Sequence, residues 1–138
     1  MNWNEFIPVE EITNQVTAKT VDFAKRFGEF LGKDDKADRN GRQITERDKL
    51  TTNQLRKFFG EVKRQQMKGY DVTDFVLLKP KLAYAVSRAK GNNPKIKDFY
   101  EVMSNAIDQV SDEKSFRNFI KIFEAIVAYH KATEENKL

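Results

Sequence analysis

The spacing of the apolar residues constrains this chain more than any other feature of its sequence. Apolar side chains recur at intervals of three, four and seven through most of the 138 residues, and no segment alternates as a half-buried strand would. Only three prolines and six glycines interrupt the pattern. The spacing predicts an all-α fold, a compact bundle of about five helices that forms one domain over residues 1–138.

The first predicted helix spans residues 9–31, where apolar residues such as Phe23 and Phe27 fall on one stripe. Gly32 is a suitable end for this helix. Residues 33–49 then mix acidic and basic side chains with almost no apolar ones. Such a segment buries too little surface to offset its ordering entropy, so we expect a charged, mobile surface loop there.

The second predicted helix has a clearly marked start. Thr51 and Gln54 have the types and spacing of a capping box, and Leu50 and Leu55 those of the accompanying hydrophobic staple. A third helical stretch, over residues 72–89, contains Pro80, which requires a kink or a restart with Pro80 in a first turn. We expect four of its side chains to face inward: Leu82, Ala85, Val86 and Ala89.

Two more helices complete the predicted bundle. Asn93-Pro94 is an N-cap followed by a proline in the first helical position, which opens the fourth helix. The fifth begins near Asp112 and runs to about Thr133, with apolar residues on two nearly opposite faces. A helix of this kind must lie at the centre of the bundle or be shared with another chain. The polar end, residues 132–138, is expected to fray.

The positive charge is concentrated in the middle of the chain. Residues 50–97 carry eleven Lys/Arg and three Asp/Glu, whereas residues 1–49 and 98–138 have net charges of −1 and −3. Repulsion within such a segment is unfavourable unless an anionic partner meets it. Nucleic acid is the commonest partner of that kind.

Several classes of function find no support in the sequence. There is no cysteine and only one histidine, His130, so soft-ligand metal sites are excluded and no catalytic constellation or cofactor motif stands out. No apolar run approaches the roughly 18 residues of a membrane span. The N-terminus lacks the basic and apolar stretches of a secretory signal. We therefore expect a cytoplasmic protein that is not an enzyme and has no metal, cofactor or membrane partner.

Basic side chains interleaved with an aromatic one form the strongest functional signal. The second predicted helix carries Arg56, Lys57, Lys63 and Arg64, and the third carries Lys79, Lys81, Tyr84 and Arg88. Such groups meet phosphates through charge-assisted hydrogen bonds, and Tyr84 can stack on a base or simply pack. The competing interpretation is an ordinary solvated helix face. The concentration of positive charge on two neighbouring helices favours nucleic-acid binding over this interpretation.

Three segments resemble one family. Residues 50–58 (LTTNQLRKF), 78–88 (LKPKLAYAVSR) and 123–131 (FEAIVAYHK) resemble, in the same order, segments of the small-subunit family of type III-A CRISPR–Cas (Csm) effector complexes. In the second segment the family has Ala-Gly-Arg where this chain has Val86-Ser87-Arg88, so the glycine is replaced and the arginine is kept.

The resemblance implies a non-catalytic helical subunit of an antiviral ribonucleoprotein. Several copies would stack along the duplex of guide RNA and target RNA and hold the target strand. Partners would be both RNAs, further copies, the backbone ribonuclease subunit and the large signature subunit. Carried over by position, the RNA-contact candidates are Arg56, Lys79, Lys81 and Arg88, followed by Lys57, Lys63 and Lys131. Tyr129 and His130 are assigned to packing or to a subunit interface.

Two other functions fit the same composition. The chain could be a purely structural scaffold whose basic face docks on an acidic protein. A helix-turn-helix DNA regulator is less favoured, because its recognition helix would need polar base-reading side chains near its start, and Lys79-Pro80-Lys81-Leu82 offers few.

Overall fold

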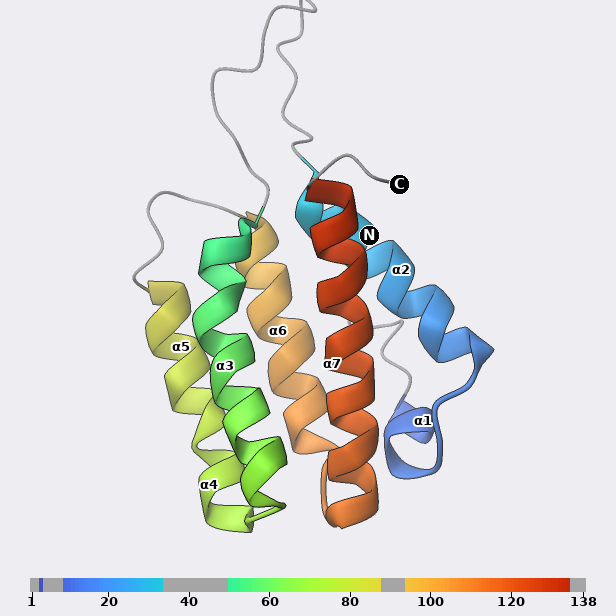
Figure 1. Ribbon diagram of the computed structural model, residues 1–138, viewed down its shortest axis with the longest axis vertical. Helices are drawn as coiled ribbons and strands as arrows, with labels where there is room; N and C mark the ends of the chain where they lie inside the picture. The colour runs from blue at the N-terminus through green and yellow to red at the C-terminus, as the bar shows by residue number, and fades with distance from the viewer. Residues whose placement is uncertain (1–2, 4–8, 34–49, 88–93, 135–138) are drawn as a thin grey trace, which may run out of the picture.

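The computed structural model of the chain describes residue 3 and residues 9–33, 50–87 and 94–134 (Figure 1). The regular elements in this part of the chain are all helices and none is a strand, so the predicted all-α fold is confirmed. Five helices have ten or more residues, and two have five. They are α1 (Val9–Thr13), α2 (Ala18–Gly32), α3 (Thr52–Lys68), α4 (Val72–Val76), α5 (Leu78–Ser87), α6 (Pro94–Asp108) and α7 (Glu113–Glu134).

The long first helix predicted over residues 9–31 is wrong, because the chain leaves the helical path between α1 and α2. Thr17 adopts an extended conformation as the N-cap of α2, and its backbone N–H donates to Thr20 Oγ1 over 3.0 Å. Threonine and asparagine compete for backbone hydrogen bonds and favour caps over helix interiors. The apolar stripe continues across residues 14–17, so periodicity alone does not detect the break.

The other helix boundaries follow the sequence closely. Leu50 and Leu55 are both buried at the start of α3, as a hydrophobic staple requires, whereas the side chain of Gln54 lies outside the described residues. Pro94 opens α6. α7 continues to Glu134, so residues 132–134 are helical, and residues 135–138 of the predicted frayed end are outside the described part. Except for Lys33, the predicted loop over residues 33–49 is also outside it.

α4 and α5 show how Pro80 is accommodated. The helical stretch is interrupted at Leu77 and restarts at Leu78, which places Pro80 in the first turn of α5, as predicted. Leu78 and Leu82 are buried, but Ala85 is exposed, so its predicted inward position is wrong. The restart at Leu78 changes which residues of α5 face the core. Ala89, also predicted to face inward, lies outside the described residues.

α7 is the central element of the bundle. It lies between α2 with α1 on one side and α3 with α6 on the other, and α4–α5 forms the outer edge beyond α3 (Figure 1). Four of its buried apolar residues are Phe119, Ile122, Phe123 and Ile126. These residues lie on both of the apolar faces read from the sequence. Helices of the same chain therefore pack against both faces of α7.

Two glycines allow α2 to approach α7 closely. A Cβ atom at Gly28 would lie 2.7 Å from the carbonyl oxygen of Ile126 and 2.9 Å from the backbone nitrogen of His130. A Cβ atom at Gly32, one turn later, would lie 2.8 Å from the carbonyl oxygen of His130. The spacing of four residues puts both glycines on the same helix face. Any larger side chain there would push the two helices apart.

Candidate nucleic-acid interface

Many basic residues of the middle segment are held by carboxylates of the same chain. Five of the eleven cations in residues 50–97 form ion pairs: Lys63, Arg64, Lys68, Lys79 and Lys81. Arg88 and Lys90 lie outside the described residues. The remaining four are Lys95, which is buried, and Arg56, Lys57 and Lys97, which are exposed. The net charge of the segment therefore overstates how many of its cations are free to meet an anion.

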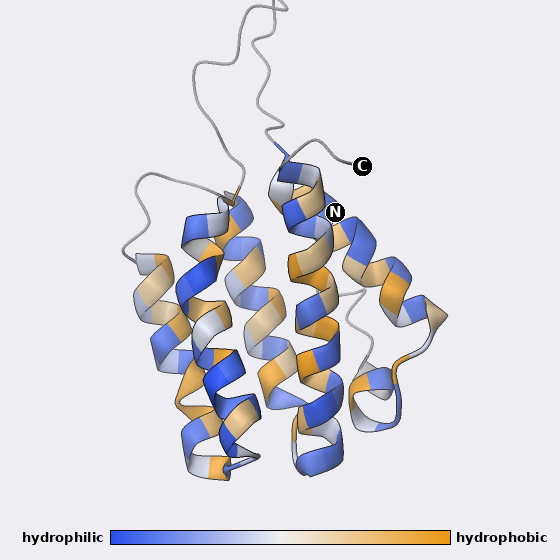
Figure 2. Ribbon diagram, in the orientation of Figure 1, coloured by the Kyte–Doolittle hydropathy of each residue, from blue (hydrophilic) through white to orange (hydrophobic). Residues whose placement is uncertain are grey.

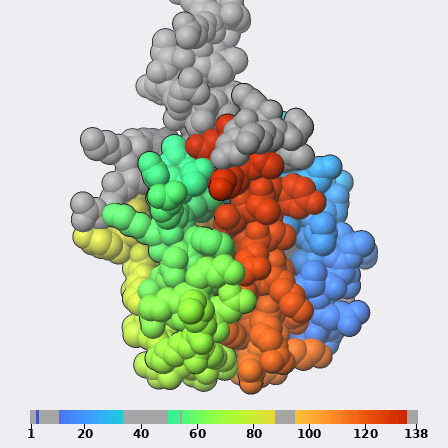
Figure 3. All heavy atoms as spheres, in the orientation of Figure 1, coloured from blue at the N-terminus to red at the C-terminus, as the bar shows by residue number. Residues whose placement is uncertain are grey.

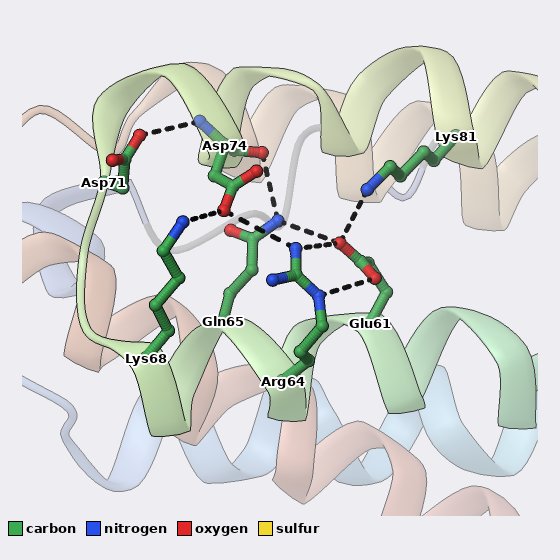
Figure 4. A network of polar contacts seen from close by, with 7 residues as sticks. All are labelled: Glu61, Arg64, Gln65, Lys68, Asp71, Asp74 and Lys81. Atoms are coloured by element: carbon green, nitrogen blue, oxygen red, sulfur yellow. Dashed lines mark hydrogen bonds and ion pairs between the residues drawn. The ribbon is translucent and has the colours of Figure 1, made fainter.

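One network of polar contacts joins α3 to α4 and α5 (Figure 4). Glu61 accepts hydrogen bonds from Arg64 Nη2 at 2.6 Å and from Lys81 Nζ at 2.7 Å. The hydrogen bond from Arg64, together with that from Lys81, lowers the pKa of Glu61 to about 2. The carboxylate is therefore charged at neutral pH and holds Lys81 beside α3. Asp74 pairs with Lys68 in the same way, over 2.6 Å.

Two further pairs connect neighbouring helices. Lys79 Nζ on α5 lies 2.6 Å from Asp108 Oδ1 on α6. Lys63 on α3 is hydrogen-bonded to Glu124 on α7, and its ammonium lies 5.6 Å from the centre of the Phe59 ring. Because exposed ion pairs contribute about 0–1 kcal/mol each, a phosphate group can displace such a carboxylate.

Lys95 is buried and has a structural role. Its side chain is only 2% exposed, and its Nζ donates to the backbone carbonyls of Phe30, over 2.7 Å, and of Lys33. These carbonyls belong to the C-terminal end of α2, where a cation is favourable. Lys95 therefore holds the start of α6 against the end of α2 and is not available to an anionic partner.

A different set of cations is free on the face formed by α3 and α7. Arg56, Lys57 and Lys131 are exposed, and no carboxylate of the described residues pairs with them. At the start of α3, Thr52 Oγ1 donates to Glu134 over 2.6 Å, and nearer its end Lys63 pairs with Glu124. These two bonds fix the antiparallel register of the helices and place Lys131 at about the level of Arg56.

Gly60 adds no side chain to the middle of this face. It follows Arg56 by one helical turn, and a Cβ atom at this position would meet no atom within 4 Å. Figure 3 shows α3 and α7 side by side on the face turned to the viewer, and strongly hydrophilic positions recur along both helices in Figure 2. We call Arg56, Lys57 and Lys131 the α3–α7 basic cluster. Arg56 shares its stripe with Thr52 and Lys63, which contact α7, whereas Lys57 shares its stripe with Glu61 and lies nearer to α5. Cations spread across the outer side of two helices in this way suit a phosphate backbone.

Comparison with protein families assigns the chain to a family. The model of the family described as Csm2 Type III-A matches residues 28–136, which is most of the chain. The chain belongs to this family. The predicted resemblance to the type III-A small subunits is thus confirmed, and the match extends upstream of the three segments that carried it, into α2. Comparisons with curated proteins and with solved structures gave no match.

Membership of the Csm2 Type III-A family makes the chain a small subunit of a type III-A CRISPR complex, which associates with the other subunits of that complex. The family is a structural one, in agreement with the predicted lack of catalytic activity. In the described part of the chain, no helix combines the length and hydrophobicity of a membrane span. No cluster of three or more potential metal-ligating side chains occurs there either.

The remaining candidate residues occupy different environments. Tyr84 is 62% exposed on α5, three residues after Lys81. His130 is 1% exposed, and its Nε2 contacts the carbonyl oxygen of Leu50, which gives it a packing role within the chain. Tyr129 is partly exposed beside it, and its position at a subunit interface stays a prediction. Arg88 is outside the described residues.

Sequence reasoning missed the residues that decide which cations are free. Glu61, Asp108 and Glu124 are ordinary acidic residues in the sequence, and only the packing of the helices shows which lysine each one holds. Lys121 was also missed as a site residue. It is exposed on α7, in the charged arc that also holds Arg117 and Lys131, and this arc was the signal that could have found it.

Proposed function

We propose that this chain is the non-catalytic, RNA-binding small subunit of a type III-A CRISPR antiviral complex in the cytoplasm. Several copies stack along the guide RNA–target RNA duplex, and each helps to hold the target strand. The observation that supports this proposal best is the α3–α7 basic cluster, because Arg56, Lys57 and Lys131 are exposed and have no carboxylate partner among the described residues. Free cations at such positions lower the cost of bringing a polyanion to the surface.

The proposed mechanism is electrostatic. Guanidinium and ammonium groups neutralise phosphates and release counterions, which gives affinity without reading the bases. One subunit contributes few contacts, so the isolated chain binds weakly and the repeated copies provide the strength. Other subunits carry out the chemistry. Lys63, Lys79 and Lys81 form a second group of contacts, which must first release Glu124, Asp108 and Glu61. Arg88 is included in this second group by its position in the sequence.

The salt dependence of RNA binding tests the proposed function. For the purified subunit and a single-stranded RNA, the logarithm of the affinity should fall linearly with the logarithm of salt concentration. Replacing Arg56 and Lys57 by glutamine should reduce the magnitude of this slope by about 1–2, since each lost phosphate contact contributes about 0.7 on a single strand. Fluorescence anisotropy from low to high salt measures both quantities.

Lys19→Gln with Lys25→Gln is the matched control, because these two α2 lysines are also exposed and the change in net charge is the same. The control should keep the wild-type slope. A flat response of the wild-type protein, or an equal effect of both double variants, would contradict the proposal. Loss of complex assembly with unchanged RNA affinity would instead favour a scaffold that docks on an acidic protein.

A further inference from the structure

One carboxylate oxygen between α3 and α5 is surrounded by hydrogen-bond donors. Glu61 Oε1 accepts from Arg64 Nη2 over 2.6 Å and from Lys81 Nζ over 2.7 Å. Gln65 Nε2 lies 3.3 Å from the same oxygen, and this residue is only 2% exposed. Figure 4 shows Lys81 reaching across from α5 to Glu61, with Arg64 and Gln65 beside the carboxylate. Two cations and a buried amide that converge on one anionic oxygen would also suit the oxygen of a phosphate.

Glu61 is held more firmly than Glu124 and Asp108, the carboxylates that pair with the other two lysines of the second group of RNA contacts. The side chain of Glu61 is 21% exposed, whereas those of Glu124 and Asp108 are 38% and 50% exposed. Water and salt weaken exposed ion pairs more than partly buried ones. Lys81 is therefore the least available lysine of that group.

Without Glu61 in this position, a row of cations would remain. Lys57, Glu61 and Arg64 occupy positions i, i+4 and i+7 of α3, so they lie on the same side of the helix. Arg64 has a second carboxylate within reach, since its Nη2 lies 3.5 Å from Asp74 Oδ2, and it can stay in place when Glu61 moves away. Among the described residues, no other carboxylate pairs with Lys81. Lys81 is thus the cation that Glu61 withholds.

A change of pH does not release Glu61. The hydrogen bond from Arg64, together with that from Lys81, lowers the pKa of Glu61 to about 2, so the carboxylate keeps its charge well above that pH. A competing anion must displace it instead. A polyanion does this more readily than a single phosphate, because its neighbouring phosphates are already held by exposed cations such as Lys57.

We propose that Arg64, Lys81 and Gln65 form a phosphate subsite for RNA and that Glu61 is its built-in competitor. In the free chain, the carboxylate occupies the position of a phosphate oxygen and lowers the affinity for RNA. On a strand that the α3–α7 basic cluster already holds, a further phosphate displaces Glu61 and recruits Lys81. The subsite depends on the proposed function and extends its RNA surface by Arg64 and Gln65, neither of which the family resemblance suggested.

The RNA affinity of Glu61→Gln tests this competition. Glutamine keeps the size of the side chain and one acceptor oxygen but removes the charge, so Lys81 becomes available. At about 0.15 M salt, the isolated variant should bind a single-stranded RNA about threefold to fivefold more tightly than wild type, and its salt slope should become steeper by about 0.7. Asp22→Asn removes one charge from an exposed pair with Arg26 on α2 and is the matched control, with an expected gain below about 1.5-fold.

A double-mutant cycle separates loss of the competitor from a general change in charge. In the wild-type background, Lys81→Gln should weaken RNA binding by less than about twofold, because Glu61 already neutralises that lysine. In the Glu61→Gln background, the same substitution should weaken binding by about threefold or more and remove most of the gain. Equal losses in the two backgrounds, or equal gains from Glu61→Gln and Asp22→Asn, would overturn the subsite.

Single substitutions in the wild-type background decide the question if thermal unfolding shows that Glu61→Gln is not folded. Lys57→Gln should then weaken RNA binding more than Lys81→Gln, and equal losses would contradict the competition. Failure of the proposed function is seen separately, as a lack of effect of Arg56→Gln/Lys57→Gln. If that double variant weakens RNA binding while Glu61→Gln behaves like its control, the proposed function stands and the subsite is wrong.

Discussion

Asn118→Asp is expected to lower the free energy of unfolding by about 3 kcal/mol or more at neutral pH. Asn118 on α7 is 5% exposed, and its amide nitrogen donates to the carbonyl oxygens of Ile12, over 3.0 Å, and of Asn14, over 3.1 Å. A carboxylate of the same shape cannot donate to either carbonyl and places a buried negative charge beside two oxygens. The substitution should therefore release α1 from α7.

The deficit of Asn118→Asp should become smaller as the pH falls. Burial raises the pKa of a carboxyl group, and a group whose pKa is higher in the folded than in the unfolded state favours folding more strongly at lower pH. Urea unfolding at pH 7 and pH 5 measures the difference. Asn53→Asp, at an exposed position in the first turn of α3, is the control and should change the stability by less than about 0.5 kcal/mol. A pH-independent deficit would contradict the buried-charge explanation.

Gly28→Ala is expected to lower the free energy of unfolding by about 2 kcal/mol. The new Cβ atom would lie 2.7 Å from the carbonyl oxygen of Ile126 and 2.9 Å from the backbone nitrogen of His130. These are backbone atoms, so the contact is relieved only if α2 and α7 separate. The strain outweighs the gain of about 1 kcal/mol in helix propensity that alanine has over glycine.

Gly60→Ala makes the same chemical change on the open face of α3 and should have the opposite sign. Nothing lies within 4 Å of the new Cβ atom, so only the helix propensity acts, and the protein should become about 0.5–1 kcal/mol more stable. Thermal or urea unfolding of the two variants side by side gives both values. Equal effects of the two substitutions would contradict the close packing of α2 against α7.

The sequence predicted the fold class because helical periodicity is a local property. The staple leucines, the first-turn position of Pro80 and the start of α6 at Pro94 all depend on residues a few positions apart, and each is found where its type requires. The division of the first helix was missed because the apolar stripe continues through residues 14–17. Hydrogen bonds from the distant Asn118 help to fix that break, and no local pattern reveals them.

The candidate site was predicted less completely, for a physical reason. Charge density along the chain identifies the helices that carry cations, and Arg56, Lys57 and Lys131 are exposed as expected. Whether a cation is free depends on the neighbours that packing brings to it. Lys63 and its partner Glu124 are 61 residues apart, and Lys95, counted in the net charge of residues 50–97, caps α2 from within the fold. These assignments need the three-dimensional arrangement.

Target RNA retention by the assembled complex measures the central claim most directly. A complex built with the Arg56→Glu/Lys57→Glu subunit should assemble normally and bind target RNA at least about tenfold more weakly at physiological salt, because reversed charges repel the phosphates in every copy. A complex built with Lys19→Glu/Lys25→Glu, the same reversal on α2, should retain target RNA like the wild type. Equal retention by all three complexes would contradict RNA binding by the α3–α7 basic cluster.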